Sequence, residues 1–429
     1  MYLDYLQKIG RLALGCALIC LLTVSLSGCK GAVPTPEPAT ITFAYLRSDR
    51  ERIEPLVEEF SEQYPHVTVE LRPATMGELS WNFEAADADV REVFTAIIDN
   101  QRERGDFLAL DPFIERDESF DVSDFYPAVL ETFTIEGKLW AIPCGVDSGV
   151  VYYNRDLFDQ YGVPYPQVGW TWDDFVSTAL ALRDPEADVY GYANREGQWG
   201  VWLFVHQLGG RIVDDMQNPT RATFDDPLTI EALEWYGDLF HDYAVAPTPQ
   251  QLRPSAGSIL SAIVMGEVGM WSDWFEARGG DSDEIWDGMK WPMRWGMVTF
   301  PRATADTATD VVGDLWAHGY ALSSQTLHPD AAWRLVAFLT AHASSRKIPA
   351  RRSVVESEEY ERQAGSEIAA VARTVLKNGL PYPPREFINK TLEALGILGE
   401  ATDMVESGQR TAQEAMDWAQ QQAETRIGP

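Results

Sequence analysis

Tryptophan and acidic residues gather in one stretch of this sequence. The chain has 15 tryptophans, and five of them fall close together, at Trp271, Trp274, Trp286, Trp291 and Trp295. An indole ring offers a broad apolar face with a hydrogen-bond donor at one edge, and a carboxylate accepts hydrogen bonds from hydroxyl groups. Sugar rings present C–H faces and hydroxyls, so this combination favours a saccharide site. The alternative is that individual tryptophans belong to a hydrophobic core.

The sequence motifs of common enzymes are absent. The six histidines are scattered without an HExxH pattern, and the chain has no GxxxxGK[ST] or GxGxxG loop. The segment GVDSG, residues 145–149, lacks the GxSxG spacing of a nucleophile elbow. We therefore expect no enzyme, no cofactor and no metal. Two alternatives stay open: a carboxylate pair for glycoside hydrolysis, and calcium at the acidic segment 281–288, which lacks EF-hand spacing and could equally be a solvated loop.

The first residues have the organisation of an export signal. Lys8 and Arg11 precede an uncharged hydrophobic stretch that is marginal for a membrane-spanning helix of about 20 residues. A basic start, an apolar middle and small residues before a cleavage site describe a secretory signal. The residues LSGC at 26–29 resemble a bacterial lipoprotein signal, which implies a signal peptide over 1–28 and lipid on the sulfur of Cys29. A retained membrane helix is the alternative.

A short tether leads into a large acidic body. Residues 29–39 hold prolines and no hydrophobic period, which predicts an extended segment. The remaining residues exceed the size at which one core stops growing, so we expect two domains. Cys144 is the only cysteine of that body, and we expect a buried thiol without a disulfide. The net charge of −32 disfavours binding to nucleic-acid phosphates and favours solubility outside the cell.

Hydrophobic spacing predicts an α/β fold. Residues 41–47 and 67–71 are rich in β-branched and apolar side chains, while Ile53, Leu56, Val57 and Phe60 repeat between them at helical spacing. Strand, helix and strand in this order predict a βαβ unit and a parallel sheet. Capping signals or periodicity predict further helices, which begin near Thr171 (with Asp174), Asp226 (before Pro227), His328 and Thr411 (with Glu414).

Six segments follow one another in an order and at distances typical of one protein family. They are LVEEFSEQYPHVTVE (56–70), GDFLALDPFI (105–114), GKLWAIPCGVDSGVVYYNRDLFDQYGVP (137–164), TWDDF (171–175), GEVGMW (266–271) and ESGQRTAQEAMDWAQQQAETRI (406–427). The body resembles the extracellular solute-binding proteins of family 1, which are the maltose-binding-protein-like, sugar-binding subunits of bacterial ABC importers. The usual PDV of that family is replaced by ADADV at 86–90. Because of this departure, Phe94 is not counted among the implied ligand contacts.

The resemblance implies a periplasmic-binding fold of type II, with two lobes that each hold a mainly parallel sheet flanked by helices. Crossing segments near Asp147, Pro301 and Ser344 would join the lobes, and ligand would lie in the cleft between them. Hinge closure is the known motion of this architecture. The implied lobes are 40–146 plus 302–343 and 147–301 plus 344–429.

The resemblance also implies partners and a location. The ligand would be a sugar or oligosaccharide, and the closed protein would deliver it to the permease subunits of an ABC importer. The protein would be a monomer outside the cytoplasm, held by its lipid in the periplasm or on the outer face of the plasma membrane. No nucleic acid takes part.

Site residues carry over from the family patterns one at a time. They come from the loop after the first strand, the pattern IPxxxDxxxxxYN, the stretch before the Gly209-Gly210 turn, GEVGMWSDW, VGDLWAHGYAL and IPARRSV. The implied ligand-binding residues are Tyr45, Arg47, Ser48, Asp147, Trp199, Trp271, Trp274, Asp314, Trp316 and Arg351.

Three functional hypotheses remain. A lipid-anchored binding protein for a sugar fits the whole body. A secreted lipoprotein glycosidase would use two carboxylates in a tryptophan-lined cleft. The same fold could instead bind a polyol, glycerol phosphate or a peptide, and Arg47 and Arg351 would favour an anionic ligand.

Overall fold

The computed structural model describes most of the chain after residue 36. The described residues are 37–81, 88–95, 98, 102, 104–195, 197–215, 219–248, 250–252, 258–278, 291–304, 310–342, 346–381 and 388–427. The chain divides into two compact units, residues 1–39 and 40–429. The predicted signal peptide, Cys29, the acidic segment 281–288 and the crossing at Ser344 lie outside the described residues.

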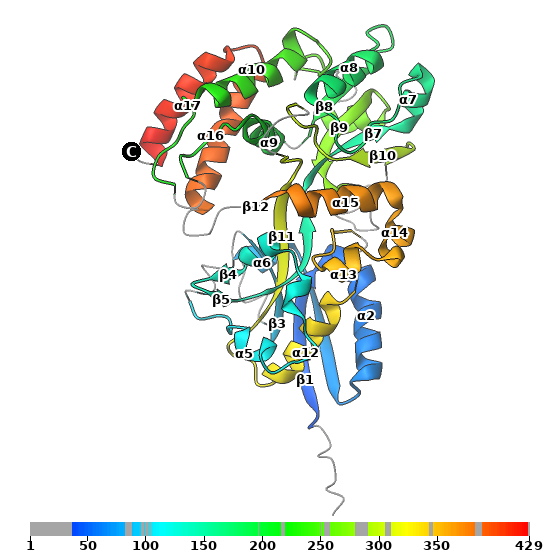
Figure 1. Ribbon diagram of the computed structural model, residues 1–429, viewed down its shortest axis with the longest axis vertical. Helices are drawn as coiled ribbons and strands as arrows, with labels where there is room; N and C mark the ends of the chain where they lie inside the picture. The colour runs from blue at the N-terminus through cyan, green and yellow to red at the C-terminus, as the bar shows by residue number, and fades with distance from the viewer. Residues whose placement is uncertain are drawn as a thin grey trace, which may run out of the picture. The chain divides into compact units, whose positions relative to one another are not determined.

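Two main sheets make up the β-structure of the described part of unit 40–429 (Figure 1). The larger has the order β12-β11-β3-β1-β2, with β6 also paired to β11, and the smaller has the order β10-β7-β9-β8. β4 and β5 form a separate pair. The strands are β1 Ala39–Leu46, β2 Val67–Ala74, β3 Val90–Phe94, β4 Thr134–Ile135, β5 Lys138–Leu139, β6 Ile142–Asp147, β7 Gly149–Asn154, β8 Tyr190–Asn194, β9 Val268–Trp274, β10 Trp295–Val298, β11 Asp314–Leu322 and β12 Leu380–Pro381.

Both sheets are mixed, whereas the sequence predicted mainly parallel ones. β1 and β3 run parallel, as a βαβ unit requires, but β11 runs antiparallel to both β3 and β6. In the smaller sheet, β7 runs antiparallel to β9 and β10. The reason is the path of the chain: it leaves the larger sheet after β6 and returns from the smaller one into β11, so β11 enters from the opposite end.

Helices cover both sheets, and their predicted starts are confirmed. α2, which follows β1 and precedes β2 in the chain, buries Ile53, Val57 and Phe60. Capping boxes close α8 and α17, and an aspartate caps α10. The helices are η1 Arg47–Asp49, α2 Arg50–Gln63, α3 Met76–Trp81, α5 Asp111–Ile114, η2 Val122–Asp124, α6 Pro127–Glu131, α7 Arg155–Tyr161, α8 Trp172–Leu182, α9 Gln198–Leu208, α10 Pro227–His241, α11 Ile259–Val264, η3 Phe275–Arg278, α12 Pro329–Thr340, α13 Arg352–Val355, α14 Glu358–Ala364, α15 Ser366–Asn378, α16 Ile388–Glu406 and α17 Ala412–Arg426.

The chain passes from one sheet to the other within two residues. β6 ends in the larger sheet at Asp147, and β7 begins in the smaller sheet at Gly149. Gly149 donates its backbone N–H to Asp314 Oδ1 of β11 over 2.7 Å, which fixes this junction against the returning strand. Buried residues of α15, such as Val375, pack in one core cluster with side chains from both sheets, and Figure 1 shows this helix beside the junction.

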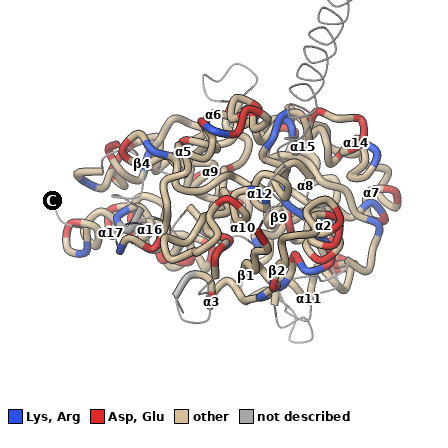
Figure 2. Tube along the Cα trace, turned by 90° about the horizontal axis from the view of Figure 1, so that it is seen from below, with Lys and Arg blue, Asp and Glu red and all other residues tan. Residues whose placement is uncertain are grey.

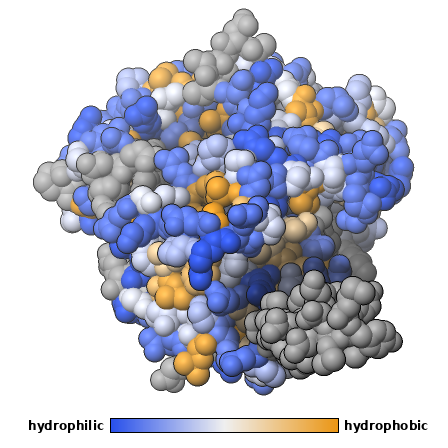
Figure 3. Space-filling model, turned by 60° about the horizontal axis from the view of Figure 1, so that its bottom comes forward, coloured by the Kyte–Doolittle hydropathy of each residue, from blue (hydrophilic) through white to orange (hydrophobic). Residues whose placement is uncertain are grey.

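Charge lies on the surface and apolar side chains lie inside. Figure 2 shows acidic and basic positions interspersed along the trace, and the face seen in Figure 3 is mostly hydrophilic with separate small hydrophobic areas. Cys144 is buried on β6, and burial raises the pKa of its thiol. The expectation of a buried, unpaired thiol is confirmed for the described residues.

A pair of glycine substitutions tests the packing of α8 on β8. A Cβ added at Gly191 would lie 2.0 Å from the carbonyl oxygen of Ala179, so Gly191→Ala forces backbone apart and should destabilise by about 1–3 kcal/mol or more. Gly396 lies exposed in α16 with no atom within 4 Å of an added Cβ. Gly396→Ala should therefore stabilise by up to about 1 kcal/mol. Urea unfolding measures both, and equal midpoints would contradict this packing.

Candidate functional site

A cavity of about 330 Å³ lies where elements of the two sheets meet. From the larger sheet and its helices come Met76, Asp147, Trp316 and His318, and from the side of the smaller sheet come Trp199, Trp274 and Glu276. This volume is at the lower end of the range for small-molecule sites. Of the described residues that line it, none is lysine or arginine.

Strand geometry brings the residues of the larger sheet together. Asp147, the last residue of β6, pairs with Trp316 of β11 in the antiparallel register. Side chains two residues apart in a strand share a face, so His318 follows Trp316 on the same side of β11. The cavity wall on this side is therefore set by one strand pair.

Three indole rings form the apolar walls. Trp199 lies in the first turn of α9 and Trp274 ends β9, and their ring centroids are 6.1 Å apart at an interplanar angle of 62°. Trp199 also meets Trp316 at 6.4 Å and 74°. Trp199 thus meets both other rings in edge-to-face contacts, and all three rings line the same cavity.

Asp147 is an almost fully enclosed acid of the cavity. Its side chain is 4% exposed, and Oδ1 accepts the backbone N–H groups of Ser148 at 2.9 Å and Glu276 at 3.1 Å. Burial raises the pKa of this carboxyl well above its usual value, and the charge of Glu276 raises it further. Oδ2 accepts no hydrogen bond from the described residues, which leaves it for a ligand.

His318 connects the cavity to a buried ion network. Its Nδ1 lies 3.1 Å from Glu92 Oε1, and Glu92 also receives the Lys347 ammonium at 3.2 Å. Lys347 lies 2.6 Å from Asp49 Oδ2. Burial alone would raise the pKa of Glu92, but Lys347 and His318 hold that pKa below its usual range. His318 thus lines the cavity with its Nδ1 committed to Glu92.

The structure thus brings four of the ten predicted residues around one cavity: Asp147, Trp199, Trp274 and Trp316. Trp271 lies elsewhere, fully buried and stacked on Tyr152 at 5.7 Å and 9°, because its position in β9 points to the core. Tyr45 is also fully buried, against Phe43 at 5.3 Å.

The remaining predicted residues hold other parts of the fold. Arg351 lies over the ring of Phe120 at 4.6 Å and pairs with Asp124 at 3.4 Å, outside the cavity lining. Arg47 is an exposed partner of Glu78. Two more are structural in their contacts: the Ser48 carbonyl accepts a bond from Arg346 at 3.2 Å, and Asp314 binds the Gly149 N–H.

Three lining residues were missed by the sequence reasoning. His318 follows Trp316 by two positions, so strand alternation could have placed it on the same face. Glu276 follows Trp274 by two positions but lies in η3, where no strand period applies. Met76 begins α3 with 43% of its side chain exposed, and no sequence signal pointed to it.

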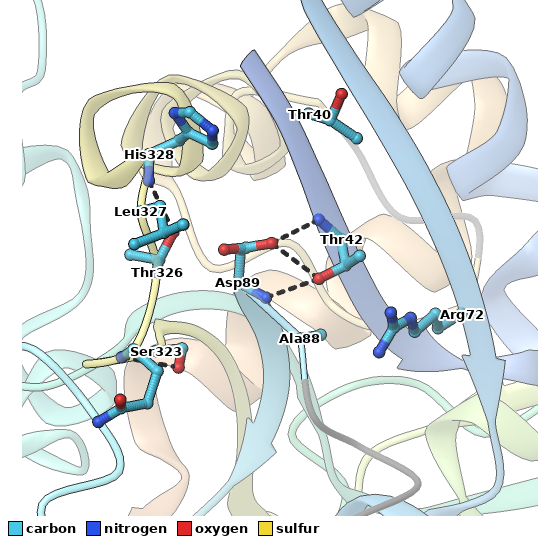
Figure 4. A pocket seen from close by; sticks show the side chains of 10 residues that line it. Thr40, Thr42, Arg72, Ala88, Asp89, Ser323, Thr326, Leu327 and His328 are labelled. Atoms are coloured by element: carbon cyan, nitrogen blue, oxygen red, sulfur yellow. Dashed lines mark hydrogen bonds between the residues drawn. The ribbon is translucent and has the colours of Figure 1, made fainter.

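A second cavity of about 360 Å³ lies beside the start of β1 (Figure 4). Its acid, Asp89, accepts bonds from the Thr42 backbone N–H and hydroxyl, both at 2.8 Å, and donates its own N–H to Thr42 Oγ1. These bonds join β1 to the start of β3. Against the effect of burial, the pKa of Asp89 is lowered by a hydrogen bond from the Thr326 side chain and by the bonds from Thr42. We assign this acid a structural role.

Two further properties concern the described residues only. No cluster of three or more His, Cys, Asp or Glu side chains there is arranged to hold a metal ion. Among the described helices, none is both long and apolar enough to cross a membrane.

Comparison with known proteins places the chain in a family. The family model for bacterial extracellular solute-binding proteins matches residues 46–345, and the chain belongs to this family. An ABC substrate-binding protein from Listeria monocytogenes, solved with cycloalternan, has a TM-score of 0.71 at 21% identity. The alignment covers 91% of this chain and all of that one. The two-lobed type II fold is confirmed by this likeness.

Curated relatives match over shorter spans. A mannitol-binding protein from Pseudomonas aeruginosa is 23% identical over 253 residues, which are 57% of this chain and 55% of that protein. An arabinooligosaccharide-binding protein from Halalkalibacterium halodurans is 25% identical over 135 residues, 32% of this chain and 29% of the relative. The chain thus spans about half or less of the length of these relatives.

Two tryptophans three residues apart should behave differently. Trp271→Ala removes a fully buried ring and should lower the free energy of unfolding by about 3–5 kcal/mol. Trp274→Ala opens a cavity wall that already meets solvent, so its cost should be much smaller. Chemical denaturation measures both. Equal losses would show that Trp274 is a core residue as well.

Proposed function

We propose that this chain is the substrate-binding component of an ABC importer and captures a sugar or polyol between its two lobes. The observation that carries the proposal is the cavity in which three indole rings and two carboxylates meet, in a chain of the solute-binding family. The relatives named for mannitol and for arabinooligosaccharides support this ligand class.

The residues would act by binding alone. Indole faces pack against the C–H faces of a sugar or polyol, while Asp147 Oδ2, Glu276 and the free nitrogen of His318 accept hydrogen bonds from hydroxyl groups. All three polar groups are acceptors when His318 donates from Nδ1 to Glu92. A hydroxyl-rich solute supplies the donors that they need.

The residues that line the cavity do not favour an anionic solute. That alternative depended on Arg47 and Arg351, and neither lines the cavity. Two acidic side chains, Asp147 and Glu276, line the cavity instead, and an ionised carboxylate repels an anionic group. Glycerol phosphate is therefore the less favoured ligand.

The transport cycle would follow from the fold. Binding draws the lobes together, and the closed form docks on permease subunits. We propose the lobe boundaries predicted from sequence, 40–146 plus 302–343 and 147–301 plus 344–429. Buried side chains of residues 348–376 pack in a core cluster that holds residues of both sheets, so this segment contacts both lobes.

We also propose that Cys29 carries lipid and holds the protein on the outer side of the membrane. The support is the LSGC sequence after a basic and apolar start, followed by the proline-rich tether. Two or more acyl chains give stable attachment, since each buried methylene contributes about 0.8 kcal/mol.

A melting screen tests the proposed binding. A sugar or polyol at 100 times its dissociation constant should stabilise the protein by about 2.7 kcal/mol. Trp274→Ala should remove the shift because it removes one wall. Trp140→Ala is the matched control: this ring is also partly buried but lies outside the cavity, bonded to the Ile135 carbonyl at 3.3 Å, and its variant should keep the shift.

The same cavity allows a test against catalysis. Two carboxylates facing one space also occur in glycosidases. We expect chromogenic glycosides to give no steady product release. Turnover that is lost in Asp147→Asn would overturn the binding-only proposal.

Membrane attachment depends on a single side chain in this proposal. Cys29→Ser should move the exported protein from the membrane fraction to the soluble fraction, because it removes the thioether that carries lipid. Cys144→Ala is the control and should stay with the membrane. A Cys29→Ser protein that remains in the membrane fraction would favour a retained helix instead. Cell fractionation with mass analysis gives the readout.

A further inference from the structure

Two carboxylates at the cavity lack a matching positive charge. Asp147 is 96% buried, and its contacts with the described residues are two backbone N–H groups, both on Oδ1. The partly buried carboxylate of Glu276 takes part in no hydrogen bond or ion pair with the described residues. A buried charge without a partner is costly. The cavity therefore presents two acidic side chains, and none of the described residues that line it is a lysine or an arginine.

The nearby cations are already matched. The Lys347 ammonium lies 2.6 Å from Asp49 and 3.2 Å from Glu92, and these two charges, not Glu276, contribute most to the raised pKa of Lys347. Arg195, next to β8, forms an ion pair with Asp273. Neither side chain is among the described residues that line the cavity.

The apolar walls have the form of an aromatic cage. Trp199 stands at steep angles to both Trp274 and Trp316, so the three rings face a shared space from different directions. Indole is the aromatic group that attracts cations most strongly, with about 0.5–2 kcal/mol for each favourable contact. Aromatic cages of this kind with an acid nearby recognise amines and quaternary ammonium groups.

We propose that the solute carries a positively charged nitrogen, which sits between the three indole rings and the carboxylates of Asp147 and Glu276. The inference rests on the proposed function and narrows its ligand class to amino sugars, amino polyols and related organic cations. The hydroxyl groups of such a solute bond the remaining acceptors, including His318. The nitrogen supplies the charge that the cavity lacks.

A small inorganic cation fits these walls less well. A bare ion needs several oxygen ligands in place of its water, whereas three of the seven described lining residues are tryptophans and one is methionine. An organic cation loses less hydration and uses the ring faces. A neutral sugar would satisfy the hydrogen bonds but would leave both carboxylates without a countercharge.

Calorimetry with pairs of solutes that differ in one amino group tests whether the cavity prefers a positively charged solute. The pairs are D-sorbitol and D-glucamine, D-glucose and D-glucosamine, and cellobiose and the β-1,4 dimer of glucosamine, with choline as a cation that is not a sugar. The protein without its first 29 residues is used at pH 7 and at low and high salt. We expect at least one amine to bind ten times tighter than its neutral partner, with a preference that shrinks at high salt.

Glu276→Gln isolates the charge, because the amide keeps the shape and the hydrogen-bonding oxygen. It should weaken amine binding at least ten times more than it weakens binding of a neutral sugar, whose hydroxyls also use Glu276 as an acceptor, with an unchanged melting point of the free protein. Glu424→Gln, an exposed acid on α17, is the control and should alter neither.

The outcomes separate this inference from the proposed function. Neutral sugars that bind as tightly as their amines overturn the inference and leave the sugar-binding function standing. If choline binds, Glu276→Gln weakens that binding and no sugar binds, the result supports a positively charged solute and overturns the proposal that the solute is a sugar. Equal loss of amine and neutral sugar in Glu276→Gln overturns the inference, and no binding by any probe overturns both.

Discussion

A carboxylate kept out of water at the end of β6 is the constraint on which this site depends. One oxygen of Asp147 accepts two backbone N–H groups, from its own neighbour and from η3, so it ties the last residue of the larger sheet to the segment that follows β9. Each of these N–H groups would cost about 1–3 kcal/mol if left unsatisfied. The geometry of the junction, the position of Glu276 and the opposition of Asp147 to Trp316 all follow from this arrangement.

The acidic side chains of the protein lie in two different environments. Most of its acidic side chains lie in solvent, where a net charge of −32 is screened and costs little. Inside the larger sheet, Asp49 and Glu92 instead share Lys347, whose ammonium lies at hydrogen-bonding distance from both carboxylates. The cavity follows neither pattern. Its two acids, one buried and one partly buried, have no lysine or arginine beside them among the described residues that line the cavity.

The sequence predicted the helices well because their signals are local. Thr171 and Thr411 form capping boxes that act within four residues, and the buried face of α12 follows from its period. Strand direction was predicted less well, since β11 pairs with strands far away in the sequence. At the site, Trp274 and Asp147 could be found from family spacing. The burial of Trp271 could not, because it depends on which face of β9 points to the core. Glu276 was missed because it lies in η3, where no strand or helix periodicity places it.

The single buried thiol of the body has a practical consequence. Cys144 is the only cysteine after Cys29, and its raised pKa and burial make it a poor nucleophile. A cysteine introduced at Met76, on the exposed rim of the cavity, would therefore react alone with a thiol-specific fluorophore. The native chain already has the chemistry of a reagentless optical sensor, in which the emission of one dye follows the occupancy of the cleft.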